Sequence, residues 1–235
     1  MKNKIITTIS LLLFILISLD SQAGVEEVIF KIQETPSEYL EVNTGKSGNY
    51  DKNFHNRALG LTSRLLFNET GSKFELIEQL LDEDQEIDVV MLLRLDGIHF
   101  NNLSQKKFGE QNQYSDKVIN IIDTFQIYWT IDDKKSRTIL GYDCKFAEGY
   151  YYVYSDRLKK NRKFKCAAWF APEIPVSYGP REFHGLPGLI LSSRITRRLE
   201  MVAISMEIKK SETGVDFSFL EKGRDMTRDE LNRSF

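Results

Sequence analysis

Apolar residues recur at every second position along much of the chain, a spacing that predicts β-strands because successive strand side chains point to opposite faces. Val28, Phe30 and Ile32 follow this spacing, and so do the apolar residues of 59–67. Between Phe125 and Ile131, apolar side chains at odd positions alternate with more polar ones. The same reasoning predicts further strands at 87–95, 98–100, 137–147, 150–154, 163–170, 201–208 and 215–220.

Two segments instead carry helix-start signals. Ser72 and Glu75 have the spacing of a capping box, and the apolar residues that follow fall on one helical face. This pattern predicts a helix that ends near Asp84. Thr227 and Glu230 repeat the capping-box spacing and predict a short C-terminal helix.

So many short strands with only two helical patterns predict a mainly β protein. We expect a single curved antiparallel sheet or a partly open barrel with one or two helices, and a two-sheet β-sandwich is the alternative. Residues 101–119 are polar and weakly patterned, so they are predicted to form a loop. No Gly/Ser linker, low-complexity stretch or internal repeat divides residues 24–235, which are therefore expected to form a single β-rich domain.

Residues 1–23 have the layout of a secretory signal peptide. Lys2 and Lys4 form a positive start, an apolar run over 5–19 follows, and Ser21 and Ala23 place small side chains at the cleavage site. The run is shorter than the ~20 residues that a spanning helix needs, which favours cleavage after Ala23 over an uncleaved membrane anchor. We therefore expect an exported protein, periplasmic or extracellular, whose mature chain has no transmembrane segment.

The charge of the chain argues against one class of partner. Its 32 lysines and arginines stand against 34 aspartates and glutamates, which gives a formal net charge of −2. Nucleic-acid-binding proteins need a broad basic surface, so no nucleic acid partner is expected. One basic cluster falls at a predicted hairpin tip, where it either keeps the turn solvated or docks to anionic lipid. Its members are Arg157, Lys159, Lys160, Arg162, Lys163 and Lys165.

The chain has two cysteines, Cys144 and Cys166. In an oxidising compartment such a pair tends to form a disulfide, and a disulfide is the prediction here; two buried free thiols are the alternative. The cysteine spacing matches no zinc-binding pattern, and the sequence has no C-x-x-C redox motif.

Four of the five prolines lie between residues 172 and 187, so this stretch cannot form a central strand. Pro187 and Gly188 stand at the central positions of a predicted type II turn, and Gly185 is expected to allow a close backbone approach. The leucines around this turn either plug the end of the core or form an apolar lip over a cavity or a partner surface. On the second hypothesis the candidate binding residues are Tyr178, Phe183, His184, Gly185, Leu186, Pro187, Gly188, Leu189 and Ile190.

The same loop makes the chain resemble the GLPGLI family of exported Bacteroidota proteins, which is named for residues 185–190 as they stand here. Other stretches look like landmarks of that family in the right order, and Cys144 fits the family's cysteine position. These stretches are SKF at 72–74, WTI at 129–131, ILGYDCKFA at 139–147, AWFAPEIP at 168–175 and SYGP at 177–180. The resemblance implies a β-rich fold and an envelope or extracellular location, and it brings no established catalytic residues.

The sequence contains no motif of the common hydrolase, zinc-protease, P-loop or dinucleotide-binding classes. His55, His99 and His184 are scattered, and His184 is expected to hydrogen-bond a loop carbonyl rather than bind a metal. We predict no catalytic residues, no metal and no cofactor. We expect a non-enzymatic envelope protein that binds a lipid-like apolar ligand or a partner protein, as an accessory to outer-membrane transport or assembly. A metal-delivery protein and a hydrolase with a dispersed site are the alternatives.

Overall fold

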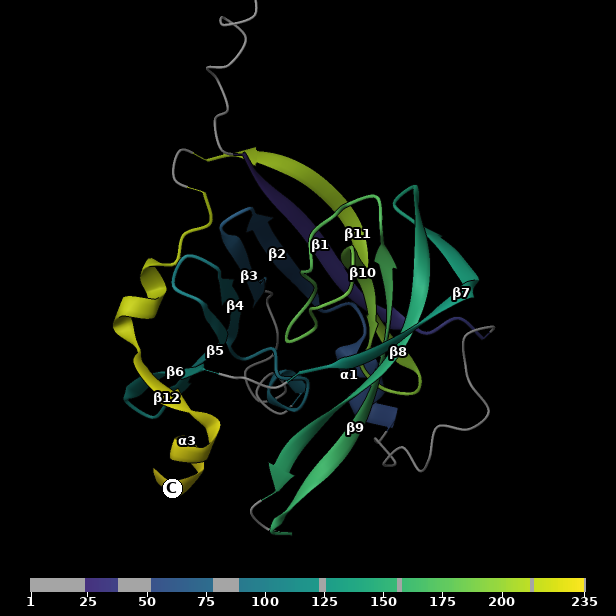
Figure 1. Ribbon diagram of the computed structural model, residues 1–235. Helices are drawn as coiled ribbons and strands as arrows, with labels where there is room; N and C mark the ends of the chain where they lie inside the picture. The colour runs from purple at the N-terminus through teal and green to yellow at the C-terminus, as the bar shows by residue number, and fades with distance from the viewer. Residues whose placement is uncertain are drawn as a thin grey trace, which may run out of the picture.

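The computed structural model describes residues 24–37, 52–77, 89–122, 126–155, 158–211 and 214–234. Within these residues twelve strands form one sheet, in the order β12-β6-β5-β4-β3-β2-β1-β11-β10-β9-β8-β7 (Figure 1). Neighbouring strands run antiparallel except β12 and β6, which are parallel. The elements are β1 (Gly24–Glu34), α1 (Lys52–Ala58), β2 (Thr62–Asn68), β3 (Gly71–Leu76), β4 (Ile98–Asn102), β5 (Lys107–Tyr114), β6 (Lys117–Ile122), β7 (Tyr128–Ile139), β8 (Tyr142–Ser155), β9 (Lys160–Ala171), β10 (Leu189–Arg194), β11 (Leu199–Lys210), the 3-10 helix η2 (Ser218–Lys222), β12 (Arg224–Thr227) and α3 (Arg228–Ser234).

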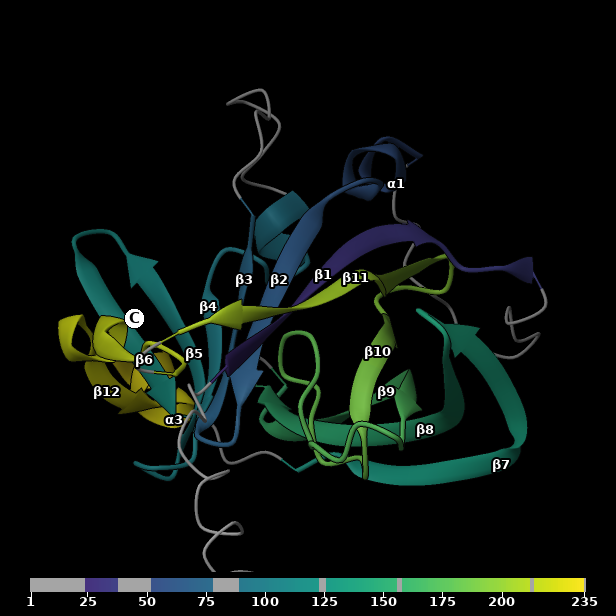
Figure 2. The same cartoon turned by 90° about the horizontal axis from the view of Figure 1, so that it is seen from above.

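The sheet curls around its main core, as the bent strands in Figure 2 show. Phe74 of β3 and Phe146 of β8 belong to the same buried cluster, although five other strands lie between theirs in the sheet order. In a flat sheet these two strands would be roughly 30 Å apart, because neighbouring strands are spaced by ~4.8 Å. The predicted mainly β fold with a single curved antiparallel sheet is therefore confirmed, and the sheet does not divide into a two-sheet sandwich.

The two capping-box spacings have different outcomes. The C-terminal helix is confirmed: the Thr227 backbone N–H donates to Glu230 Oε2 at 2.7 Å, and the Glu230 N–H donates to Thr227 Oγ1 at 3.2 Å, at the start of α3. The helix predicted from Ser72 is wrong, because residues 71–76 form β3 and Ser72 pairs with Phe67 of β2. Residues 78–84 of that predicted helix lie outside the described residues.

Three other expectations are corrected. Residues 89–92 form a helical turn rather than a strand, with the Leu93 N–H donating to the Val89 carbonyl at 2.9 Å. Residues 101–119 are not a loop, because they contribute to β4, β5 and β6. The strand predicted at 215–220 does not form, and residues 218–220 belong to η2. The sequence did not predict β5 and β6 because some of their buried positions are polar. Gln111 and Asn120 are buried and hydrogen-bonded to each other at 2.7 Å.

The proposed signal peptide at residues 1–23 lies outside the described part of the chain, and β1 begins at Gly24. No helix in the described residues is both long enough and apolar enough to cross a membrane.

Candidate functional site

Residues 172–188 connect β9 to β10 as an ordered loop, and the prediction that they form no central strand is confirmed. Backbone hydrogen bonds close the loop onto itself and onto β10. The Ile190 N–H donates to the Tyr178 carbonyl at 2.9 Å, and the Gly185 N–H donates to the Ser177 carbonyl at 3.2 Å. The side chains of this loop are therefore held in defined positions.

The turn inside this loop is not the predicted type II turn. The Gly188 N–H donates to the Leu186 carbonyl at 2.9 Å, which makes a three-residue γ-turn centred on Pro187. Gly188 has a φ of 158°, far from the roughly 80° of a type II turn, and a Cβ there would lie 2.3 Å from the Ala171 carbonyl oxygen. Gly185 has a left-handed φ of 88°. The close backbone approach expected at Gly185 is thus made by Gly188.

The apolar side chains of the loop fill the core. Leu186, Leu189 and Ile190 are each at most 1% exposed. Leu189 belongs to the main cluster, whereas Leu186 and Ile190 pack with Phe183 in a second cluster on the opposite face of β8 and β9. Pro187 and Gly185 are exposed at the surface, and Gly188 is buried against β9. Of the candidate binding residues, Tyr178, Phe183 and His184 line a cavity.

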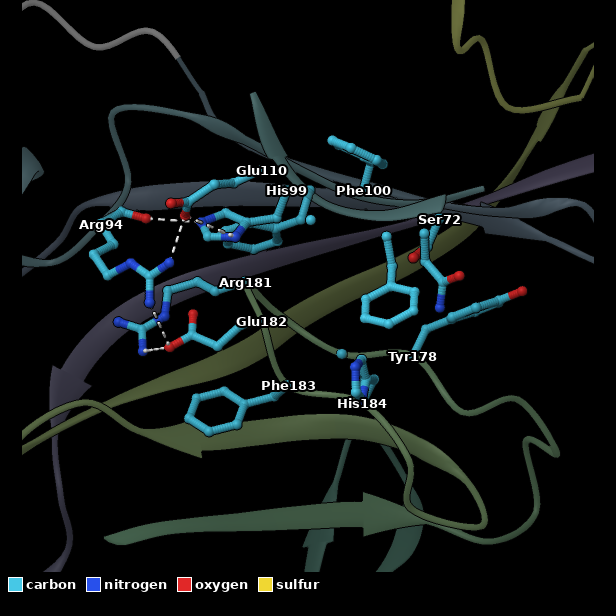
Figure 3. Close-up of a pocket in the computed structure, with 15 residues that line it drawn as sticks. Ser72, Arg94, His99, Phe100, Glu110, Tyr178, Arg181, Glu182, Phe183 and His184 are labelled. Carbon is cyan, nitrogen blue, oxygen red and sulfur yellow. Dashed lines mark hydrogen bonds and ion pairs between the residues drawn. The ribbon is translucent and has the colours of Figure 1, made fainter. Parts of the chain in front are cut away.

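This cavity lies between the loop and strands β3, β4 and β5 (Figure 3). Its volume is about 30 Å³. A buried water needs ~10–15 Å³ on this measure, so the cavity has room for about two waters and not for a lipid chain.

Four charged side chains border the cavity, and a fifth, Arg228, pairs with one of them. We call this group the charged cluster: Arg94, Glu110, Arg181, Glu182 and Arg228. Figure 3 shows Arg94 between the two carboxylates. Its guanidinium lies 2.6 Å from Glu110 Oε2 and 3.6 Å from Glu182 Oε1. Arg181 is 3.1 Å from Glu182 Oε1, and Arg228 is 3.0 Å from Glu110 Oε1. The cluster joins the β9–β10 loop to β5, to the segment before β4 and to α3.

The ionisation of this cluster is set by burial and by its own ion pairs. Burial alone would raise the pKa of Glu182, but Arg181 and Arg94 lower it to about 2. Burial would likewise raise the pKa of Glu110, and Arg94 and His99 are the largest influences that lower it. Both carboxyl groups are therefore ionised at neutral pH. Glu182 Oε2 and Arg181 Nε are buried without a hydrogen-bond partner among the described residues, so water in the adjacent cavity is their natural partner.

The two histidines near the cavity are neutral at pH 7. Burial lowers the pKa of His99, whose Nε2 lies 2.9 Å from the Arg94 carbonyl oxygen. Burial also lowers the pKa of His184, whose ring packs edge-on against Phe108 with 5.8 Å between ring centres. Trp129 Nε1 donates to the His184 carbonyl at 2.8 Å, which fixes this end of the loop.

The predicted disulfide is wrong, because Cys144 and Cys166 are both free. Cys166 pairs in register with Gly149 of β8, five residues from Cys144, which is roughly 17 Å along the strand. An odd separation also places the two thiols on opposite faces of the sheet. Burial raises the pKa of each thiol to about 12, so neither is activated as a nucleophile.

Metal-binding groups do not gather in the described part of the chain. It contains no set of three or more His, Cys, Asp or Glu side chains placed to hold an ion.

A second surface was not among the sequence candidates. Strands β7, β8 and β9 extend beyond the core (Figure 1), and on one face they carry Tyr128, Tyr150, Tyr152 and Tyr154. We call this face the tyrosine ribbon. Tyr128, Tyr152 and Tyr154 are 47%, 47% and 43% exposed. Tyr128 stacks on Tyr150 with 5.2 Å between ring centres, and Lys163 Nζ lies 3.6 Å from the Tyr150 ring centre.

Along β8, the alternation of side chains that forms the tyrosine ribbon is the same alternation that places Phe146 in the core. Phe146 and Tyr150 lie on the same face of β8, but the core ends between them. Sequence alone does not show where a strand leaves the core. The charged cluster has no local signal either, because its members come from four distant parts of the chain.

Comparison with known proteins bears on the fold more than on the activity. A family described as "Protein of unknown function (Porph_ging)" matches residues 154–192, which run from the end of β8 through β9 and the loop into β10. This family is uncharacterised and is found in Bacteroidota. No curated protein matches the chain.

Two solved structures of PNGF-II, in space groups C2 and P21, resemble the fold with TM-scores of 0.50 and 0.51. Their sequence identities are 12% and 11%, and each match covers 90% of this chain. The chain spans only about a third of PNGF-II, 32% and 33% in the two structures. Similarity at this identity shows the fold alone.

Proposed function

We propose that the protein is an exported, non-enzymatic protein of the cell envelope that docks onto a large surface through the tyrosine ribbon. The observation that carries this proposal is the exposure of Tyr128, Tyr152 and Tyr154 together on strands that extend past the core. Exposed tyrosines on a rigid scaffold suit binding, because their large amphipathic rings lose little conformational entropy when they are covered.

The geometry supports this function over the alternatives. The cavity beside the β9–β10 loop, of about 30 Å³, suits water better than an apolar ligand, so this loop does not form the lip of a lipid site. A hydrolase that uses a cysteine nucleophile has no support, because burial raises the pKa of both thiols to about 12. A metal-delivery role has no support from a ligand set in the described residues.

The test is retention of the protein on envelopes. The full chain is expressed with its own N-terminus in a Bacteroidota host, and the fraction bound to washed envelopes is measured. We expect the triple variant Tyr128→Ser, Tyr152→Ser and Tyr154→Ser to lose about tenfold in retention, because aromatic anchors dominate such contacts. A matched control is Leu103→Ser, Ile204→Ser and Ile208→Ser, whose side chains are 51%, 45% and 76% exposed on other elements.

Equal retention of the tyrosine variant and the control would overturn the proposal, provided that both melt like the wild type. The same preparations test export. Intact-mass measurement of the bound protein is expected to show a chain that begins at Gly24, and an unprocessed N-terminus would contradict cleavage after Ala23.

A further inference from the structure

The end of the β8–β9 hairpin combines apolar and basic side chains without a core beneath them. Leu158, in the turn, is 49% exposed, and Tyr152 and Tyr154 lie just behind it. Leu158 is therefore not a lone exposed apolar side chain, because it stands with two large tyrosines at one end of the hairpin. Apolar groups that gather on a surface, rather than single exposed side chains, mark places where a partner or a membrane binds.

Positive charge surrounds this apolar end. Lys159, Lys160, Arg162, Lys163 and Lys165 are all exposed. Residues 149–165 contain a single acidic residue, Asp156, which with Arg157 lies outside the described residues. Two of the charged groups lie over aromatic rings: Lys163 Nζ is 3.6 Å from the Tyr150 ring centre, and the guanidinium carbon of Arg162 is 5.1 Å from the Phe164 ring centre. Lys163 and Lys165 pair in register with Tyr152 and Tyr150 and so lie on the face of the tyrosine ribbon, whereas Lys160 and Arg162 lie on the opposite face. Positive charge therefore flanks the end of the hairpin on both faces, and an anionic surface is its complementary occupant. We call Tyr154, Leu158 and these five cations the ribbon tip.

We propose that the ribbon tip docks the protein onto an anionic lipid bilayer. This inference rests on the proposed function and identifies the surface that the tyrosine ribbon binds. Leu158 and Tyr154 enter the boundary between headgroups and acyl chains, and the lysines and arginine lie against the lipid phosphates. Tyrosine suits this boundary because its ring is apolar and its hydroxyl remains hydrated. An acidic protein or polysaccharide would also attract the cations, but it would not require an exposed leucine and tyrosines among them.

The test is co-sedimentation of the chain 24–235 with vesicles. Phosphatidylcholine vesicles are compared with vesicles of phosphatidylcholine mixed with phosphatidylglycerol. We expect binding to the mixed vesicles to be at least about tenfold stronger and to weaken as salt is added, because salt screens the attraction.

Two variants separate the apolar part from the charged part. Leu158→Ser leaves every charge in place and is expected to weaken binding to the mixed vesicles about tenfold, because less apolar surface is buried. A triple variant removes three of the charges: Lys159→Gln, Lys160→Gln and Lys165→Gln. We expect it to bind the mixed vesicles about 100-fold more weakly, since each lysine contributes roughly fivefold. The matched control is Lys106→Gln, Lys117→Gln and Lys222→Gln, which removes the same charge from exposed positions on other elements and should lose less than about threefold.

Each result decides the inference. If the mixed vesicles fail to bind the wild-type chain while retention on envelopes still depends on Tyr128, Tyr152 and Tyr154, the lipid inference is wrong and the proposed function stands. If Leu158→Ser binds like the wild type and soluble heparin competes fully, the tip recognises a polyanion and the lipid inference is again overturned. If vesicle binding depends on the ribbon tip but envelope retention does not change when the tyrosines are replaced, the lipid inference stands and the proposed function of the tyrosine ribbon is wrong.

Discussion

Gly185 and Gly188 lie three residues apart in the β9–β10 loop, but the fold requires them for different reasons. At Gly185 the constraint is the backbone, because a φ of 88° is left-handed and strains any residue with a Cβ. At Gly188 the constraint is space, because Ala171 of β9 occupies the place where a Cβ would stand. A sequence pattern that identifies both glycines as turn residues cannot separate these two causes.

The two causes predict different costs. Gly188→Ala is expected to lower the free energy of unfolding by about 3 kcal/mol, because the carbonyl it would meet belongs to the backbone and cannot rotate away. Gly60→Ala is the control for strain alone, since Gly60 has a φ of 90° and open space around it, and should cost about 1 kcal/mol. Urea unfolding of the chain 24–235 measures both, and equal losses would contradict the steric account.

The cysteines allow a second test at the scale of single residues. Because Cys144 and Cys166 lie on opposite faces of the β8–β9 pair, both are expected to be free even after export. Unfolding without a reductant should release two titratable thiols, and a reductant should leave the melting temperature unchanged. A disulfide found by non-reducing peptide mapping would contradict the register of β8 with β9.

At the scale of elements, local signals succeed where nothing else competes for the backbone. Thr227 and Glu230 cap α3 because the chain there has just left an edge strand of the sheet. Ser72 has the same spacing, but the tight turn formed by Asn68 and Thr70 returns it alongside β2. Glu75, the intended capping partner, instead lies 2.9 Å from Lys73. Strand pairing has overridden the local helix signal.

The strands β5 and β6 were missed for a related reason. Strand prediction reads apolar alternation, whereas the buried positions here include Glu110, Gln111 and Asn120. Their partners lie about a hundred residues away: Asn120 Nδ2 donates to the Leu220 carbonyl at 2.8 Å, and Arg228 pairs with Glu110. Fold class and many strands could therefore be predicted from sequence, while the charged cluster and the tyrosine ribbon depend on contacts that only the folded chain creates.

The cap of α3 gives a prediction at this scale. Thr227→Ala removes both the acceptor for the Glu230 N–H and a donor to its carboxylate, and should cost about 1 kcal/mol. Because α3 lies at the end of the chain, the loss is expected mainly as faster amide hydrogen exchange in 228–234. Thr196 also bonds a nearby N–H but lies far from α3, so Thr196→Ala should leave exchange there unchanged. Unaltered exchange in Thr227→Ala would contradict the capping role.

At the scale of the whole molecule, the charged cluster fastens the curled sheet across its opening. Glu182 comes from the loop before β10 and Glu110 from β5, and six strands lie between β5 and β9 in the sheet order. Arg94 contacts both carboxylates, and Arg181 also donates to the Leu93 carbonyl at 2.9 Å. Such pairs are costly to break one partner at a time, because the partner left behind is a buried charge.

Because the cluster is titratable, the stability of the whole molecule should depend on pH. The pKa of Glu182 is lower in the folded chain, at about 2, than its usual value, so its contribution is complete above pH ~4.5 and is lost as the pH falls toward 2. Burial lowers the pKa of His99 and His184, so the unfolded chain takes up their protons first and stability already begins to fall below pH ~6.5. Glu182→Gln should lower the free energy of unfolding by about 3 kcal/mol at pH 7. In urea unfolding, the difference in free energy between this variant and the wild type should become smaller between pH 5 and pH 3. Glu221→Gln changes an exposed position and is the control, so its free energy of unfolding should follow that of the wild type at every pH. If the difference between Glu182→Gln and the wild type does not change with pH, the carboxylate charge does not hold the loop to β5.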